Sequence, residues 1–124
     1  MVDVEHRWLW PANVTRVIDG DTIDVEIDTG FRTVRYERLR LFGVNCPEIH
    51  GVSHDAGLAA KKFTTDWCSV VPAGMWPFTI ETFKTDVFGR WLARVWHGDR
   101  TATDDSVELT QALLQAGHAV PFRK

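Results

Sequence analysis

The chain has 124 residues, of which 44% are hydrophobic and 25% charged, as expected for one globular domain with an apolar core. Its 14 basic and 17 acidic residues give a net charge of −3. That balance argues against a general nucleic-acid coat with a broadly basic surface, but it allows an enzyme with arginines gathered in a cleft. No apolar run approaches the roughly 20 residues that a membrane helix needs, so the sequence predicts no membrane association.

The N-terminal stretch, residues 1 to 14, does not resemble a secretory signal. It carries acids where a signal peptide begins with basic residues, and its apolar part is short. We therefore expect a cytoplasmic protein, or one of the host cytoplasm if a phage encodes it, with Cys46 and Cys68 as free thiols. The length and the lack of a repeat or linker predict a single domain over residues 1–124.

Residues 14 to 44 show the patterns of three strands. The first strand leads into a turn at Asp19-Gly20-Asp21, and residues 23 to 28 then alternate apolar and acidic side chains, which is typical of a strand with one buried face. Residues 28 to 30 predict a hairpin turn in which the glycine supplies the left-handed conformation. Residues 31 to 43 are then expected to form a long third strand.

The second half of the chain predicts a helix, two strands and a second helix, at about residues 55–69, 77–83, 90–97 and 106–116. The first helix presents Ala59, Phe63 and Trp67 at four-residue intervals, which indicates its apolar stripe. Asp105 and Glu108 predict a capping box at the start of the second helix. The order of elements favours an α+β, mainly β fold: a five-stranded barrel of the oligonucleotide-binding (OB) type with about two helices. Other small mixed folds show the same order and stay open on the pattern alone.

Two short segments carry more polar groups than a turn or a strand end requires. In DGDT, residues 19–22, a hairpin corner is the ordinary explanation, but two carboxylates around one glycine also suit calcium or magnesium. In RLRLFGVNCPE, residues 38–48, Arg40, Asn45 and Glu48 are expected to lie close together. An arginine can hold a phosphate through paired hydrogen bonds, and a nearby glutamate can take a proton from water. A salt bridge across a strand end is the alternative.

A third segment, TDVFGR at residues 85–90, is by itself an ordinary surface turn that ends on Arg90. Together, DGDT in the first hairpin, the pattern R-x-x-x-V-[ND]-x-P-E after the third strand and this turn resemble the staphylococcal nuclease family, also called thermonucleases. The closing ELTQALLQAGHA is similar to that family's terminal helix. The resemblance spans about residues 14–120, the expected core of the domain.

The resemblance implies a monomeric, divalent-metal-dependent nuclease. Calcium is the expected ion, with another divalent cation as the alternative. The implied reaction is hydrolysis of phosphodiester bonds in DNA and possibly RNA, with single strands preferred. Attack that releases the 5′-oxygen would leave 3′-phosphate ends.

The same resemblance implies roles for individual residues. Arg40, Glu48 and Arg90 occupy the family's catalytic positions, with Glu48 acting as general base on the attacking water or holding that water in line. Four residues match positions around the metal: Asp21 as the calcium-binding aspartate, Asn45 where a second aspartate is usual, Cys46 where a backbone carbonyl completes the ligands, and Asp19 as an acid that shapes the second shell.

Two departures from the family pattern have physical consequences. Asn45 lacks the charge of an aspartate, and because ligand charge sets calcium affinity, we expect weaker calcium binding or tolerance of another divalent ion. The family prototype's base-flanking aromatic pair near the C-terminus has no match; Phe88 or Phe122 is a candidate to stack on a base instead, although both also suit simple packing.

Two functions other than catalysis are compatible with the sequence. Some relatives, such as the repeats of Tudor-containing nucleases, keep the barrel but lose the catalytic groups, so the chain could be a catalytically weak or inactive nucleic-acid-binding module. A protein-interaction domain is supported only by the acidic charge balance. The presence of Arg40, Glu48 and Arg90 favours the enzyme.

Overall fold

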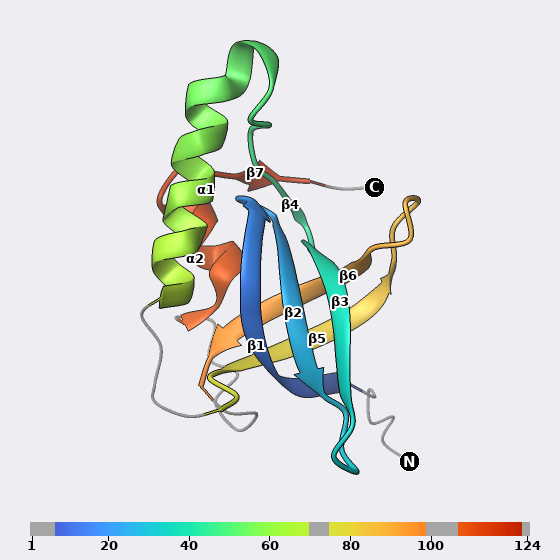
Figure 1. Cartoon of the computed structure of the whole chain (residues 1–124). Helices are drawn as coiled ribbons and strands as arrows, with labels where there is room; N and C mark the ends of the chain where they lie inside the picture. The colour runs from blue at the N-terminus through green and yellow to red at the C-terminus, as the bar shows by residue number, and fades with distance from the viewer. Residues whose placement is uncertain (1–6, 70–74, 99–106, 123–124) are drawn as a thin grey trace, which may run out of the picture.

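The computed structural model describes residues 7–69, 75–98 and 107–122. Most of its elements are strands, arranged as a barrel with two helices packed at one side (Figure 1). In chain order the elements are β1 (Trp8–Asp19), β2 (Thr22–Asp28), β3 (Val34–Leu41), β4 (Val44–Asn45), η1 (Gly51–Ser53), α1 (His54–Ser69), β5 (Phe78–Thr85), β6 (Trp91–His97), α2 (Leu109–Gln115) and β7 (Val120–Pro121).

The barrel is closed, with the strand order β1-β2-β3-β6-β5. All neighbours are antiparallel except β3 and β6, which run parallel, and β1 closes the barrel by pairing with both β2 and β5. β1 can do so because it bends: Ala12 is opposite both Ile27 and Phe78, and bulges follow further along the strand. The structure confirms the predicted mainly β, α+β fold with a five-stranded OB-type barrel.

The core fills the barrel with side chains that alternate inward along each strand. Its fully buried members include Ile23 and Val25 of β2, Leu39 of β3, Ile80 of β5 and Val95 of β6. On β3 the predicted alternation is confirmed, since Leu39 and Leu41 are buried while Arg38 is exposed. This alternation leaves Arg40 on the face opposite the core, where it becomes available to the site described below.

The first strand begins earlier than residue 14, where the sequence pattern became clear. Trp8 to Ala12 pair with β5, from Trp8 opposite Thr82 to Ala12 opposite Phe78. Pro11 within this run is a residue that normally argues against a strand, because proline has no N–H to donate. Pairing with a segment distant in sequence therefore decides the start of β1.

The third strand is shorter than the predicted residues 31–43, so that prediction was wrong at both ends. Gly30, Phe31 and Arg32 all have positive φ angles, of 87°, 55° and 60°, which is incompatible with a strand. The Thr33 N–H donates to Gly30 O at 2.9 Å and closes a longer hairpin loop than expected. β3 then runs only from Val34 to Leu41.

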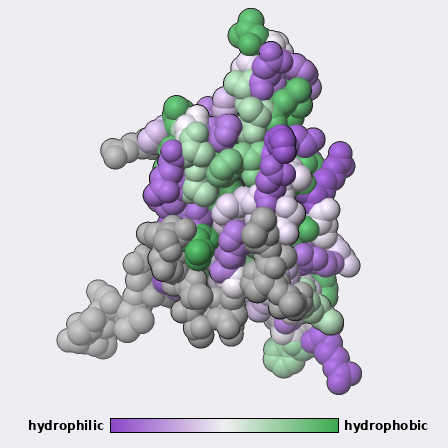
Figure 2. Space-filling view, turned by 90° about the vertical axis from the view of Figure 1, so that its left-hand side faces the viewer, coloured by the Kyte–Doolittle hydropathy of each residue, from purple (hydrophilic) through white to green (hydrophobic). Residues whose placement is uncertain are grey.

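The first helix, α1, was predicted within one residue of its observed start and at its observed end. Its predicted apolar stripe was partly wrong, because Ala59 is exposed while Phe63 and Trp67 pack against the core. Its buried residues are small ones, Gly57, Ala60 and Thr64. Small side chains let the helix axis approach the barrel closely. Figure 2, which faces the α1 side of the molecule, shows hydrophilic and hydrophobic residues interspersed on the helix's outer face.

The second helix, α2, starts with Glu108 as its N-cap, and not as the third residue of a capping box. The Glu108 side chain is fully buried and accepts hydrogen bonds from Thr110 N at 2.8 Å, Gln111 N at 3.3 Å and the Thr110 hydroxyl. Arg94 on β6 forms an ion pair with it at 3.2 Å. The buried charge thus fastens α2 to the barrel. Asp105, the expected partner in the capping box, lies outside the described residues.

A small second sheet, which the sequence did not reveal, joins β4 and β7. Val44 pairs with Pro121 and Asn45 with Val120, and the Phe122 N–H donates to Gly43 O at 2.9 Å. This pairing brings the C-terminal segment to the corner after β3. Cys46 and Cys68 are free thiols, as predicted. In the described part of the chain, no helix has the length and apolar character to cross a membrane.

Replacement of Glu108 by alanine should destabilise the fold by about 3 kcal/mol. The change removes a helix cap and the buried ion pair between Glu108 and Arg94, and it leaves the N–H groups of Thr110 and Gln111 without the Glu108 acceptor. Urea denaturation followed by circular dichroism measures the effect. Asp66→Ala is the matched control, since it removes an exposed carboxylate that forms a surface ion pair with Lys62 and should change stability by less than about 0.5 kcal/mol. Equal effects of the two variants would contradict the anchoring role of Glu108.

Candidate active-site cleft

A cleft of about 860 Å³ opens at the edge of the barrel where three loops meet. The loops are the β1–β2 turn, the corner after β3 and the β5–β6 turn. They meet because β3 pairs with β2 on one side and with β6 on the other. All the site residues predicted from the sequence line this cleft: Asp19, Asp21, Arg40, Asn45, Cys46, Glu48, Phe88 and Arg90.

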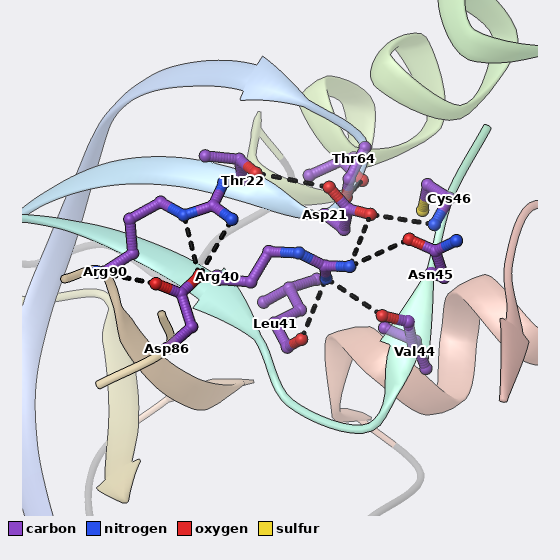
Figure 3. Close-up of polar contacts among 11 residues, drawn as sticks. Asp21, Thr22, Arg40, Leu41, Val44, Asn45, Cys46, Thr64, Asp86 and Arg90 are labelled. Atoms are coloured by element: carbon purple, nitrogen blue, oxygen red, sulfur yellow. Dashed lines mark hydrogen bonds and ion pairs between the residues drawn. The ribbon is translucent and has the colours of Figure 1, made fainter. Parts of the chain in front are cut away.

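The Asp21 carboxylate connects the β1–β2 turn to the corner after β3. It is 7% exposed, and its Oδ2 accepts a hydrogen bond from the Cys46 backbone N–H at 2.8 Å. Its Oδ1 accepts one from the Thr22 hydroxyl at 3.2 Å (Figure 3). The Leu41 N–H donates to the backbone carbonyl of Asp21 at 2.9 Å. A buried carboxylate held by this many donors fixes the relative positions of the two segments.

The Arg40 guanidinium lies beside Asp21 and is held from several sides. Nη1 donates to the carbonyls of Leu41 at 3.0 Å and Val44 at 2.9 Å. Nη2 donates to Asn45 Oδ1 at 2.9 Å and lies 3.3 Å from Asp21 Oδ2 (Figure 3). Three of these contacts are hydrogen bonds and the fourth is an ion pair, and all of them involve Nη1 and Nη2 and not Nε. Arg40 therefore contributes a fixed positive charge to the cleft and not an open two-pronged fork.

The second arginine, Arg90, is oriented by Asp86 within the β5–β6 turn. Its Nε and Nη2 lie 2.9 and 2.8 Å from Asp86 Oδ2 (Figure 3). Asp86 Oδ1 also accepts hydrogen bonds from the backbone N–H groups of Phe88 and Arg90. Burial opposes ionisation of Asp86, but these N–H groups and the guanidinium outweigh it and hold its pKa below the ordinary value. The Nη1 group of Arg90 is left to bind an anion in the cleft.

Glu48 follows the corner in a segment without regular secondary structure, and its side chain is exposed. Its backbone is nevertheless held in place. The Ser53 hydroxyl donates to Glu48 O at 2.8 Å, and Gly57 of α1 packs directly on the same peptide. Within the described ranges the Glu48 carboxylate has no hydrogen-bond or ion-pair partner. The group is therefore a positioned acceptor that is available for a proton from water.

Cys46 contributes backbone groups to the cleft rather than a reactive thiol. Burial, reinforced by the nearby charge of Asp21 and opposed by Arg40, raises the pKa of the Cys46 thiol to about 12. Because a thiol is nucleophilic only as the thiolate, this group is inert at neutral pH. The sulfur packs against Gly20, where an added Cβ would lie 3.0 Å from it.

The cleft carries charged side chains of both signs. Its lining carries the carboxylates of Asp19, Asp21, Glu48 and Asp86 against the positive side chains of Lys84, Arg40 and Arg90. Among the described residues there is no cluster of three or more His, Cys, Asp and Glu side chains that could hold a metal. Oxygen atoms of Asp21 and Asn45 nevertheless converge on one nitrogen of Arg40. This donor set suits a hard divalent ion, which would compete with Arg40 for the same oxygens.

Sequence reasoning missed two residues that shape the cleft, Asp86 and Gly57. The sequence predicts a turn around Asp86 but does not single this residue out. The signal was an aspartate two residues before the backbone N–H that it binds, a common arrangement in turns. Gly57 lies inside the predicted helix, where a glycine lowers helix propensity and gives no sign of a role in the site. Its function depends on a neighbour brought close by the fold, so no local pattern could have identified it.

Fold and cleft together define a five-stranded OB-type barrel with a charged cleft at its edge. No family model matches the chain. The chain is 29% identical over 117 residues to proteins of Escherichia coli O157:H7 and of Escherichia coli, each named "Uncharacterized endonuclease". The similarity covers 89% of this chain and 64% of each of those proteins, so the chain spans less than two thirds of their length.

Replacement of Gly57 by alanine should displace Glu48 and destabilise the protein by about 1–3 kcal/mol, because the added methyl group overpacks a tight contact. Its Cβ would lie 2.5 Å from the carbonyl carbon of Glu48 and 2.7 Å from Ile49 N. The amide resonances of Glu48 and Ile49 in a two-dimensional NMR spectrum should shift, and urea denaturation should show the lower stability. Ala59→Gly, an exposed change in the same helix, should leave those resonances in place. A Gly57→Ala protein as stable as the wild type would contradict the close contact.

Proposed function

We propose that the protein is a divalent-metal-dependent nuclease that hydrolyses phosphodiester bonds in DNA and possibly RNA, with single strands preferred. The observation that supports this most directly is that one cleft combines Glu48, a carboxylate with no partner among the described residues, with the guanidinium groups of Arg40 and Arg90. The relatives named endonuclease support the same class of reaction. The resemblance to the staphylococcal nuclease family supports these particular residue roles.

In the proposed reaction a water molecule attacks the phosphorus atom of the substrate. Glu48 accepts a proton from that water as the new P–O bond forms, or holds the water in line. Negative charge grows on the equatorial phosphate oxygens, where Arg90 offers its Nη1 donors and Arg40 its charge and Nε–H. The P–O5′ bond then breaks, and the 5′-oxygen takes a proton to become a hydroxyl. The products are a 5′-hydroxyl end and a 3′-phosphate end.

The metal would be held by the carboxylate of Asp21, the amide oxygen of Asn45 and the backbone carbonyl of Cys46, with Asp19 as a second-shell acid. When bound, a divalent ion such as calcium supplies positive charge at the phosphate and orients the attacking water. The cleft's lining supports this assignment, since its four carboxylates outnumber its three positive side chains and a bound cation would offset the difference. Asp21 and Asn45 can serve as ligands only when Arg40 yields part of its contacts with them.

Replacement of Glu48 by glutamine should lower the hydrolysis rate of heat-denatured DNA by about 10²- to 10⁴-fold, the usual contribution of one acid–base residue. The measurement is release of acid-soluble nucleotide with calcium present, and a chelator should abolish the wild-type reaction. Asp55→Asn is the matched control, because Asp55 is exposed and does not line the cleft. Binding of DNA without metal-dependent cleavage by the wild type would instead identify a binding module.

Replacement of Asn45 by aspartate should tighten calcium binding, because it adds a negative charge to the proposed ligands. Isothermal titration calorimetry with calcium measures the change directly and independently of catalysis. Asp21→Asn should act in the opposite direction by removing the carboxylate while keeping the shape of the side chain. Calcium affinity that is the same in Asn45→Asp and wild type would refute the assignment of Asn45 as a ligand.

A further inference from the structure

A second cavity, of about 380 Å³, lies at the open end of the barrel. Each of the five barrel strands contributes to its lining, which is mainly aromatic and aliphatic and includes Trp8, Trp10, Ile27, Leu39, Phe83 and Trp91. We call it the barrel-mouth cavity. Trp8, at the start of β1, lines this cavity. The helix α1 packs near the opposite end of β1, where the Thr64 hydroxyl donates to Gly20 O. The roles proposed above for the cleft do not involve this cavity.

The barrel-mouth cavity and the cleft lie on opposite faces of the paired strands β3 and β6, because successive residues of a strand point to opposite faces. Leu39 pairs with Trp91, and both line the cavity; the next pair, Arg40 and Leu92, lines the cleft. The cleft and the cavity come close to each other at the rim of the barrel. Phe42 of the cleft and Phe83 of the cavity are in contact, with ring centroids 4.6 Å apart, and are 41% and 39% exposed. A chain-like ligand in the cleft can thus cross two exposed rings to reach the cavity.

The chemistry of the cavity suits one flat aromatic ring with polar edges. Indole and phenyl rings offer stacking surfaces, and every nucleobase has a face that can use them. Arg35 and Glu37 also line the cavity, where they form an ion pair. Together they present hydrogen-bond donors and acceptors to the edge of a bound ring. A cavity of this size is within the usual range for a small-molecule site.

We propose that the barrel-mouth cavity binds an unpaired base of the same nucleic-acid strand whose backbone lies in the cleft. This inference rests on the proposed function and specifies its substrate. A base that enters the cavity must be unstacked and unpaired, so the site selects single strands and requires a few nucleotides beyond the scissile bond. Short fragments bind only in the cleft, whereas longer ones occupy both the cleft and the barrel-mouth cavity.

The test compares oligodeoxyribonucleotides of about two to ten nucleotides, bound to the full chain carrying Glu48→Gln in the presence of calcium. Affinity should rise once the strand is long enough to reach the cavity, and quenching of tryptophan fluorescence should appear at the same length because three indoles line the cavity. Phe83→Ala should weaken binding of the long strand by about tenfold and leave the dinucleotide unchanged. Tyr36→Ala is the matched control, an exposed aromatic on β3 outside both sites.

The outcomes separate the two proposals. Equal effects of Phe83→Ala and Tyr36→Ala on the long strand, while the wild-type protein still cleaves DNA, would overturn the cavity assignment alone. A wild-type protein that neither binds nor cleaves any oligonucleotide would overturn the proposed function and this inference with it. Phe83→Leu, which keeps an apolar side chain without a ring, guards against misfolding of Phe83→Ala and should show the same length-dependent loss.

Discussion

The architecture of the cleft depends on one buried carboxylate. Asp21 accepts one hydrogen bond from the backbone N–H of Cys46, 25 positions away, and lies in ion-pair contact with Arg40. It therefore joins the β1–β2 turn to the corner after β3, although each segment alone could take many positions. Without this carboxylate the buried N–H of Cys46 would lose its acceptor and the Arg40 guanidinium would lose its ion-pair partner, which is costly in a poorly solvated site. The same group is the proposed metal ligand, so the fold and the proposed chemistry depend on the same interaction.

The helix α1 supplies the second constraint, through the small side chains on its inner face. Ala60 lies where a Cβ on Gly20 would be 2.8 Å away, and the Thr64 hydroxyl donates to Gly20 O. One turn earlier in the helix, Gly57 packs on the peptide of Glu48. A single rigid element is thus in contact with both the acidic turn and the proposed general base, and it fixes the spacing between them. Larger residues at these positions would push the two segments apart.

The arginines are held in different ways, which suggests different parts in the proposed reaction. Arg40 is surrounded by acceptors and shares two of them with the proposed metal site. Arg90 is held along one edge by Asp86 and keeps its Nη1 donors available. In the proposed mechanism Arg90 is therefore the better-prepared phosphate ligand. In the same proposal Arg40 would provide charge close to the metal and would give up part of its contacts with Asp21 and Asn45.

The sequence by itself determined the order of the main elements, because period-two alternation and the four-residue spacing in α1 are local properties. It also identified the polar segments that line the cleft, since their residue types and order are visible in the chain. Tertiary structure alone decided the early start of β1, the β4–β7 pairing and the position of Glu108 as a buried cap. Each depends on a partner that is distant in sequence: β5, the C-terminal segment and Arg94. The close approach of Gly57 to Glu48 and the adjacency of the two cavities were likewise decided by packing, because contacts between distant segments leave no periodic trace in the sequence.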